Sequence, residues 1–237
     1  MNYEQLLELV KNRRSIRRFK PDAIPDEYID KIIEAARWAP SGFNQQPWEF
    51  VVIKKPEFKA KISDYCKEQL LLRHKMNAAA DPTLKVPSSI HNMKKESGDF
   101  GVAPVYIALL GDHRTMQLMP SAAQYGTNYL NDTFNAGLTC SFLYMHLAAT
   151  TLGLAAQWVS AVQAPYVNFM VKELLGIPKD FAIYDMIALG YPAAQPKPRL
   201  VRAREQMVHY DYCGPKAFRS DEDVMEYIKQ TRKVVEP

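Results

Sequence analysis

The sequence has few of the residues that carry covalent or metal chemistry. Its 237 residues include five histidines and three cysteines, Cys66, Cys140 and Cys213. The cysteines are far apart and form no C-x-x-C pair, so neither a disulfide framework nor a zinc site is indicated. This cysteine usage is typical of a reducing compartment, and we expect no metal site.

Sequence motifs for nucleotide binding and for hydrolysis are also missing. No G-x-G-x-x-G follows a predicted strand, and G-x-x-x-x-G-K-[ST], H-E-x-x-H and G-x-S-x-G do not occur. No serine or cysteine stands in a recognisable nucleophile context. If the chain is an enzyme, we expect no catalytic side chain. A cofactor would then carry the reaction, and the protein would supply binding and electrostatics.

Charge and hydropathy restrict the partners. With 30 basic and 26 acidic side chains the net charge is +4, which permits an anionic ligand but does not indicate nucleic acid. The first residues lack a basic start leading into an apolar run, so no signal peptide is expected. Polar residues interrupt the most hydrophobic window, residues 136–156, and favour a buried helix over a membrane span. We therefore expect a soluble cytoplasmic protein without a membrane or nucleic-acid partner.

Apolar periodicity and breaker residues predict one α-rich domain over residues 1–237 with four or five strands. The predicted helices cover residues 3–12, 26–38, 57–76, 121–152, 166–175 and 221–231. The predicted strands cover residues 50–53, 102–110, 154–159 and 184–189. We expect an interruption of the long helix near Gly126 or Gly137, and we expect His146 to be a core histidine with satisfied hydrogen bonds. Residues 78–98 show little periodicity and are either a loop or mobile lid, or plain surface disorder.

A basic run follows the first predicted helix. Residues 13–19, Arg-Arg-Ser-Ile-Arg-Arg-Phe, place four guanidinium groups and a hydroxyl close together. Arginine offers a planar fork of donors and serine a short one, a combination that suits a phosphate. The alternative is a solvated basic face.

A second unusual segment, residues 39–48, is Ala-Pro-Ser-Gly-Phe-Asn-Gln-Gln-Pro-Trp. It contains two prolines and several hydroxyl and amide side chains, and it has no acidic group. Amides both donate and accept hydrogen bonds, so they suit a heterocycle edge or sugar hydroxyls rather than a metal. The alternative is an ordinary helix-to-strand turn that Trp48 anchors.

Three segments together resemble the FMN-dependent nitroreductase family. They are R-R-S-x-R at residues 13–17, P-S-x-x-N-x-Q-P-W at residues 40–48, and the strand ending in Gly-Tyr-Pro at residues 190–192, with Lys197 and Arg199 after it. Their order and spacing carry the resemblance, which covers residues 5–210. It implies an α+β fold with a mixed central sheet of four to five strands wrapped by helices. It also implies an intertwined homodimer with FMN at the interface.

The resemblance also implies which residues bind FMN. Arg13, Ser15 and Arg17 would bind the ribityl-phosphate side, and Arg14 would contribute mostly main chain near the flavin. Lys197 and Arg199 would close on the same phosphate, and cations from two distant segments suit its nearly two negative charges. The other cofactor-binding residues that we expect are Pro40, Ser41, Asn44 and Gln46, in the loop that reaches the partner's flavin, and Gln157, Trp158 and Val159, which line the isoalloxazine ring.

The implied activity is hydride transfer from NADH or NADPH to the flavin, followed by reduction of a nitroaromatic, a quinone or a similar small acceptor in ping-pong order. The alternatives are other flavin chemistry on the same fold, namely reductive dehalogenation, flavin fragmentation or azoline dehydrogenation, and flavin binding without turnover. Residues 57–98 are a possible substrate lid. Residues 200–237 are expected to be an extension that packs on the partner subunit.

Overall fold

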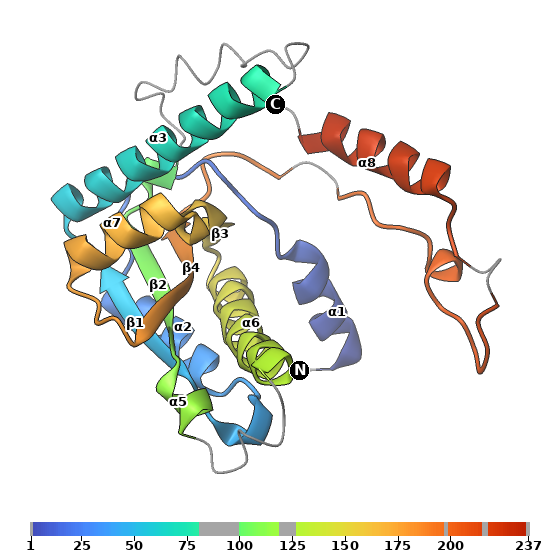
Figure 1. The fold of residues 1–237 in the computed structure, drawn as a ribbon, viewed down its shortest axis with the longest axis horizontal. Helices are drawn as coiled ribbons and strands as arrows, with labels where there is room; N and C mark the ends of the chain where they lie inside the picture. The colour runs from blue at the N-terminus through green and yellow to red at the C-terminus, as the bar shows by residue number, and fades with distance from the viewer. Residues whose placement is uncertain (1, 81–99, 119–126, 197–198, 215–217, 236–237) are drawn as a thin grey trace. The chain divides into compact units, whose positions relative to one another are not determined.

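The computed structural model describes residues 2–80, 100–118, 127–196, 199–214 and 218–235 (Figure 1). The chain forms two compact units, Met1–Ala194 and Gln195–Pro237. The first unit contains the sheet. The second contains the short helix η5 (Arg204–Gln206) and the helix α8 (Asp221–Val235). The prediction of a single domain over residues 1–237 stays a prediction.

The sheet has four strands in the order β1-β2-β4-β3. The strands are β1 (Trp48–Ile53), β2 (Val105–Asp112), β3 (Ala155–Trp158) and β4 (Phe181–Gly190), and all three pairings between them are antiparallel. Within the described chain, the parallel contribution is an isolated bridge between Ser15 and Ala156. The predicted α+β class is confirmed.

Two helical layers cover the two faces of the sheet (Figure 1). Successive side chains of β2 point to opposite faces, as the pleat requires. Val105, Ile107 and Leu109 pack in one core with the helices α2 (Asp26–Arg37) and α6 (Thr127–Thr151). Tyr106 and Ala108 pack in the other core with α3 (Pro56–Ala80) and α7 (Pro165–Leu175). Residues on β2 and β4 are buried on both faces, so this sheet is the rigid centre of the unit.

The helix α1 (Tyr3–Asn12) begins where the sequence predicts. Asn2 accepts a hydrogen bond from the backbone of Gln5, and the Gln5 side chain accepts one from the backbone of Asn2, which makes a capping box. The helix α7 ends at Gly176, which caps it with a φ of 66°, in the left-handed region. Four short elements complete the described chain: η1 (Gly42–Asn44), η2 (Phe100–Val102), α5 (Arg114–Gln117) and η4 (Ser160–Gln163).

The long helix α6 contains one of the two glycines where an interruption was expected. It runs from Thr127 to Thr151 without a break at Gly137, and the other position at which an interruption was expected, Gly126, lies outside the described residues. A Cβ at residue 137 would lie 3.0 Å from the Cβ of Ser41, so this glycine allows a loop to approach the helix. The expected core role of this helix is confirmed by its stripe of buried apolar side chains, Phe134, Leu138, Phe142, Met145 and Ala149. No helix in the described part of the chain is both long enough and apolar enough for a membrane crossing.

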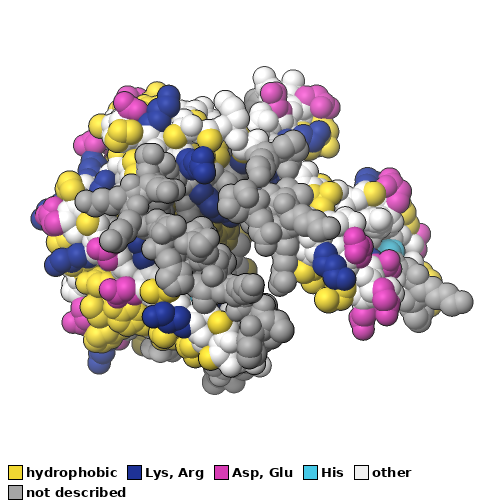
Figure 2. Space-filling model, turned by 90° about the horizontal axis from the view of Figure 1, so that it is seen from above, with side chains coloured by type: hydrophobic (Ala, Val, Ile, Leu, Met, Phe, Trp, Pro, Cys, Tyr) yellow, Lys and Arg dark blue, Asp and Glu magenta, His cyan; other side chains and the backbone are white. Residues whose placement is uncertain are grey.

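The structure describes only the first part of the predicted lid, residues 57–98. Residues 57–80 belong to α3, whose Ile62 and Cys66 are buried in the core beside α7. Residues 81–99 lie outside the described residues, so the choice between lid and surface disorder stays open. Figure 2 shows both basic and acidic side chains of the described residues on the face in view.

Candidate functional site

The arginine run lies against the edge strand β3. Ser15 forms a parallel bridge with Ala156, and the backbone N–H of Ile16 donates to the carbonyl of Ala156 at 3.2 Å. Ser15 and Arg17 are exposed, while Arg13 is half-buried at the end of α1. The structure therefore places two predicted sets of ligand-binding residues side by side, residues 13–17 and residues 157–159.

The chain after the arginine run is fixed to the Gly-Tyr-Pro turn. Lys20 donates its backbone N–H to the carbonyl of Tyr191 at 2.8 Å, and Phe19 forms a bridge with Pro192. A Cβ at Gly190 would lie 2.9 Å from the Cδ of Pro104 and 3.0 Å from a ring carbon of Phe19, so only glycine fits without a shift. The residues that directly follow the first segment of the resemblance are therefore in contact with the third segment.

The two cations that follow this turn are not part of the first unit, which contains the arginine run. Lys197 lies outside the described residues. Arg199 is exposed and belongs to the second unit. The binding of a phosphate by either residue stays a prediction.

The segment of residues 39–48, which we call the amide-rich loop, is held in an unusual backbone conformation. Phe43, Asn44 and Gln46 all have positive φ angles, of 55°, 54° and 45°. A positive φ costs free energy for residues other than glycine. Such conformations persist where the surrounding structure fixes them, often at functional sites. Here the hydroxyl of Ser41 accepts the backbone N–H of Gln46 at 2.9 Å, and the Gln46 amide donates to Asn44 Oδ1 at 3.1 Å. A Cβ at Gly42 would lie 1.9 Å from Thr133 Cγ2, so the loop packs closely on α6.

The loop and the arginine run lie at opposite ends of the sheet (Figure 1). Pro47 accepts the backbone N–H of Asp112 at 2.8 Å, at the last residue of β2. At the other end, Ser15 pairs with Ala156, which lies opposite Leu189, and Leu189 lies opposite Val105, the first residue of β2. Seven steps along β2 separate the two levels, about 24 Å at 3.4 Å per residue. A small ligand held by Ser15 and Arg17 of one chain is therefore out of reach of this loop in the same chain.

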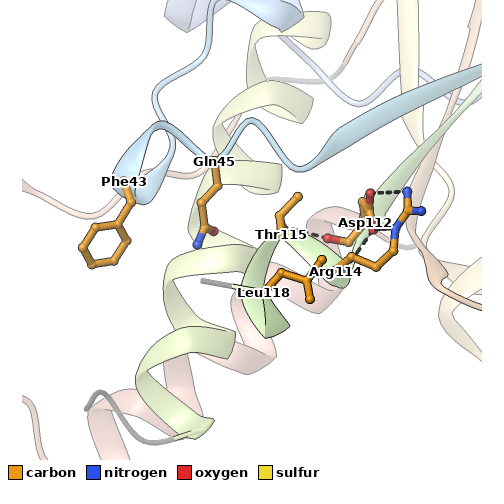
Figure 3. A pocket seen from close by; sticks show the side chains of 6 residues that line it. All are labelled: Phe43, Gln45, Asp112, Arg114, Thr115 and Leu118. Carbon is orange, nitrogen blue, oxygen red and sulfur yellow. Dashed lines mark hydrogen bonds and ion pairs between the residues drawn. The ribbon is translucent and has the colours of Figure 1, made fainter. Parts of the chain in front are cut away.

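A pocket of about 440 Å³ opens beside the loop, and sequence reasoning missed it (Figure 3). Arg114 forms a bidentate ion pair with Asp112, with Nε to Oδ1 at 2.8 Å and Nη2 to Oδ2 at 2.7 Å. The hydrogen bonds and charge of Arg114 lower the pKa of the Asp112 carboxyl. The Asp-x-Arg spacing just after a strand was the available signal. The residues that line the pocket are Phe43, Gln45, Asp112, Arg114, Thr115 and Leu118.

A buried carboxyl lies behind Trp158, and the sequence analysis did not single it out. Asp185, on β4, is 0% exposed. Its Oδ2 accepts the indole N–H of Trp158 and the amide of Gln163, the latter at 2.9 Å, and its Oδ1 accepts the backbone N–H of Met186 at 2.9 Å. Burial raises the pKa of Asp185 to about 6, although the three hydrogen bonds act in the opposite direction.

His146 is buried as predicted, but its hydrogen bonds are not satisfied. It is 1% exposed, and neither ring nitrogen has a hydrogen-bond partner among the described residues. The expectation of a satisfied histidine is therefore wrong for the described residues. Two aromatic rings flank the imidazole, Phe142 at 5.1 Å and Trp158 at 5.8 Å between ring centroids. Burial and the positive charge of Arg13 lower the pKa of His146 to about 4, so the ring is neutral at pH 7.

The segment at residues 157–159 has the chemistry to hold a polar heterocycle. The side-chain oxygen of Gln157 is buried and lacks a hydrogen-bond partner in the described chain. An unpaired buried acceptor is costly, so this oxygen suits a ligand N–H. Trp158, the next residue, is 39% exposed, and its ring lies on the side of the strand that faces Phe142 of α6. In the described residues, no group of three or more His, Cys, Asp or Glu side chains could hold a metal ion.

Comparison with known proteins identifies the family. The model of the Nitroreductase family matches residues 10–191. The chain is 27% identical over 192 residues to a putative NADH dehydrogenase/NAD(P)H nitroreductase from Archaeoglobus fulgidus, covering 80% of this chain and 86% of that protein. It is 30% identical over 202 residues to an iodotyrosine deiodinase from Hydra vulgaris, covering 84% of this chain and 70% of that protein.

Solved structures agree on the fold. An NADPH:FMN oxidoreductase from Vibrio harveyi in complex with NAD+ superposes with a TM-score of 0.69 at 18% identity, covering 97% of this chain and 85% of that chain. A nitroreductase with bound FMN from Bacteroides fragilis superposes with a TM-score of 0.61 at 22% identity, covering 90% and 100%. FMN, the cofactor predicted from the sequence, is thus confirmed for proteins of this kind. Because the family model spans well over half of its length, the chain belongs to the nitroreductase family.

Proposed function

We propose that the protein is an FMN-dependent oxidoreductase that takes hydride from NADH or NADPH and reduces a small organic acceptor such as a nitroaromatic or a quinone. Bound FMN supplies the hydride and electron chemistry. The observation that carries the proposal is the pairing of Ser15 with Ala156, which sets the arginine run beside residues 157–159. The nicotinamide and the organic acceptor would occupy the same pocket in turn, which gives ping-pong kinetics.

The phosphate end of FMN would be held by the arginine run. Arg13, Ser15 and Arg17 would donate charge-assisted hydrogen bonds to the phosphate and ribityl oxygens, and the main chain of Arg14 would lie near the flavin. Lys197 and Arg199 are proposed as further phosphate ligands.

The ring end would lie against residues 157–159. The unpaired Gln157 oxygen would accept the N–H group of the flavin ring. Trp158 would pack on the ring system, and Val159, which is buried, would shape the floor of the site. These roles explain why a polar acceptor and an exposed aromatic side chain occur together on this short edge strand.

A second copy of the chain would complete the site. About 24 Å of strand separates the arginine run from the loop of Pro40, Ser41, Asn44 and Gln46, so we propose that this loop reaches the flavin of the partner subunit. The protein would then be an intertwined homodimer with FMN at the interface. Residues 57–98 remain a proposed substrate cover, and residues 200–237 a proposed arm on the partner.

Reductive dehalogenation is a second candidate, because the chain is 30% identical to the Hydra vulgaris iodotyrosine deiodinase. Anaerobic mixing with each nicotinamide separates the two candidates. The first proposal expects NADH or NADPH to bleach the absorbance of bound FMN. Failure of both nicotinamides, together with turnover of a halogenated phenol by dithionite-reduced protein, would favour the second.

FMN retention tests the site directly. We expect Arg17→Ala to release FMN during dialysis, with an affinity at least tenfold lower, since a charged hydrogen bond to phosphate contributes about 1.5–3 kcal/mol. Arg18→Ala is the matched control. It makes the same change at the next, exposed residue, whose backbone carbonyl accepts the N–H of Ala193. Wild-type protein that stays colourless after incubation with FMN, or equal FMN loss from both variants, would contradict the proposal.

A further inference from the structure

Five side chains form what we call the Trp158 cluster. They come from β3, β4, α6 and η4, and they are Trp158, Asp185, Gln163, Phe142 and His146. Phe142 lies 4.5 Å and His146 5.8 Å from Trp158 between ring centroids. The indole N–H donates to Asp185. Trp158 is thus held by rings and by a hydrogen bond at its nitrogen, while 39% of its surface stays exposed.

A β-bulge lies directly beside Asp185. Asp185 lies opposite Leu109 on β2, but the next pair along the strands is Ile183 with Leu110, so Tyr184 has no partner in this register. Such a bulge re-aims the side chains beside it. The Tyr184 hydroxyl forms a 2.6 Å hydrogen bond with Thr139 on α6, and the Tyr184 carbonyl accepts the amide of Gln163 at 2.9 Å. These contacts fix the strand at the point where the carboxyl turns towards the indole.

The hydrogen bonds of the Asp185 carboxyl depend on whether it is protonated. An ionised carboxylate only accepts, whereas a protonated one must also donate. Oδ2 already accepts two donors, from Trp158 and Gln163, so a proton there would displace one of them. A proton on Oδ1, which accepts Met186 N–H, would turn Oδ2 into a carbonyl-type oxygen, and both charge-assisted bonds would weaken. In either case the hydrogen bond between the Trp158 indole and Asp185 changes.

We propose that Asp185 is the positioning residue for Trp158 at the flavin, and that gain or loss of one proton on its carboxyl changes the position of the indole. The effect on the flavin rests on the proposed function, since it requires FMN beside residues 157–159. The coupling of Asp185 to Trp158 stands on the geometry alone. Chemistry at the flavin would then depend on pH through a residue that itself does not touch the ring.

The titratable groups around the cluster are few in the described chain. From α6, His146 faces Trp158, and its lowered pKa of about 4 keeps it neutral at the pH where Asp185 titrates. From β4, Tyr184 is engaged with Thr139. Arg13 acts by its charge on His146. Burial and three hydrogen bonds, without a charged neighbour from the described residues, determine the pKa of Asp185, which is about 6.

The indole N–H signals of the full-length protein with its flavin, followed by ¹H–¹⁵N NMR from pH 5 to 8, test the coupling. We expect the signal of Trp158, assigned with Trp158→Phe, to titrate with a midpoint near pH 6, and the absorbance and reduction rate of the flavin to follow the same midpoint. Trp38 is an internal control. Its indole donates to Glu34 at 2.8 Å, and hydrogen bonds from Arg37 and Trp38 lower the pKa of that carboxyl, so its signal should stay constant.

Two variants decide the assignment. Asp185→Asn should abolish both titrations. Gln163→Met removes one donor that favours the ionised carboxylate, so it should move both midpoints to higher pH, and it serves where the Asn variant does not fold. A Trp158 signal that stays constant in the wild type, or that still titrates in Asp185→Asn, would overturn the coupling. If the Trp158 signal titrates but the absorbance and reduction rate of the flavin do not change with pH, the positioning role is overturned. Absence of bound FMN would instead contradict the proposed function, and the indole titration would still decide the coupling.

Discussion

Replacing His146 should make the protein more resistant to acid. The folded state keeps the imidazole neutral, with a pKa near 4, whereas the unfolded chain protonates it at the ordinary value of 6.5. The stability that depends on the neutral ring is therefore intact above pH 6.5 and is lost as the pH falls towards 4. Between pH 7 and pH 4.5 the linkage relation gives a loss of about 2 kcal/mol from this one residue. His146→Leu removes that loss.

At pH 7 two effects oppose one another in the same variant. Removal of a buried imidazole without hydrogen-bond partners relieves a cost of about 1–3 kcal/mol. Loss of the ring contacts with Phe142 and Trp158 costs about 0.5–1.5 kcal/mol for each aromatic pair. We therefore expect little net change at pH 7 and a clear gain at pH 4.5.

Urea unfolding at fixed protein concentration, followed by circular dichroism at both pH values, measures the effect. The free energy of unfolding of His146→Leu, relative to wild type, should rise by about 2 kcal/mol on going from pH 7 to pH 4.5. His209→Leu, which changes an exposed histidine, is the matched control. Parallel pH profiles for His146→Leu and wild type would show that the buried imidazole does not cause the loss of stability in acid.

Further substitutions test other parts of the structure. Asp185→Asn should remove the opposite pH dependence: the raised pKa of Asp185 means that its cost to stability grows as pH rises from 3.8 through 6, so the variant should gain about 1 kcal/mol relative to wild type between pH 5 and pH 7 in the same urea assay. Gly190→Ala should lower the free energy of unfolding by about 1–3 kcal/mol, since its Cβ would meet Pro104 and Phe19, and an unchanged urea midpoint would contradict this packing. Gly42→Ala should weaken FMN binding in equilibrium dialysis by displacing the loop from Thr133 Cγ2. The double variant Gly42→Ala/Thr133→Ser, which lacks that methyl group, should recover it, and failure to recover would show that the clash is not the cause.

Local sequence signals predicted much of the fold. The α1 helix has the predicted bounds, and Gly176 ends α7, because capping and glycine conformation are properties of a few neighbouring residues. The continuity of α6 at Gly137, one of the two positions where an interruption was expected, has a non-local cause. Helix propensity treats glycine as unfavourable within a helix. Here Gly137 leaves room for Ser41, which approaches the helix from a loop distant in the sequence.

The site could be predicted from sequence only in part. Residues 13–17 and 157–159 were both singled out, and a backbone bridge brings them together. The separation of the amide-rich loop from that run depends on strand register, which no local pattern reveals. Asp185 sits in an otherwise apolar strand, and its role depends on a bulge and on Trp158 from another strand. The unsatisfied state of His146 likewise depends on which side chains surround it.

We propose that each flavin site takes its arginine run from one chain and its amide-rich loop from the other. A mixed dimer of two defective variants tests this arrangement: Arg17→Ala, which weakens the run, and Gly42→Ala, which displaces the loop. In a mixed dimer isolated with two affinity tags, one of the two sites would combine the intact run of one chain with the intact loop of the other. We expect one FMN to bind tightly per mixed dimer, although neither variant binds FMN tightly alone. Mixed dimers that bind no more FMN than the parent variants would contradict it.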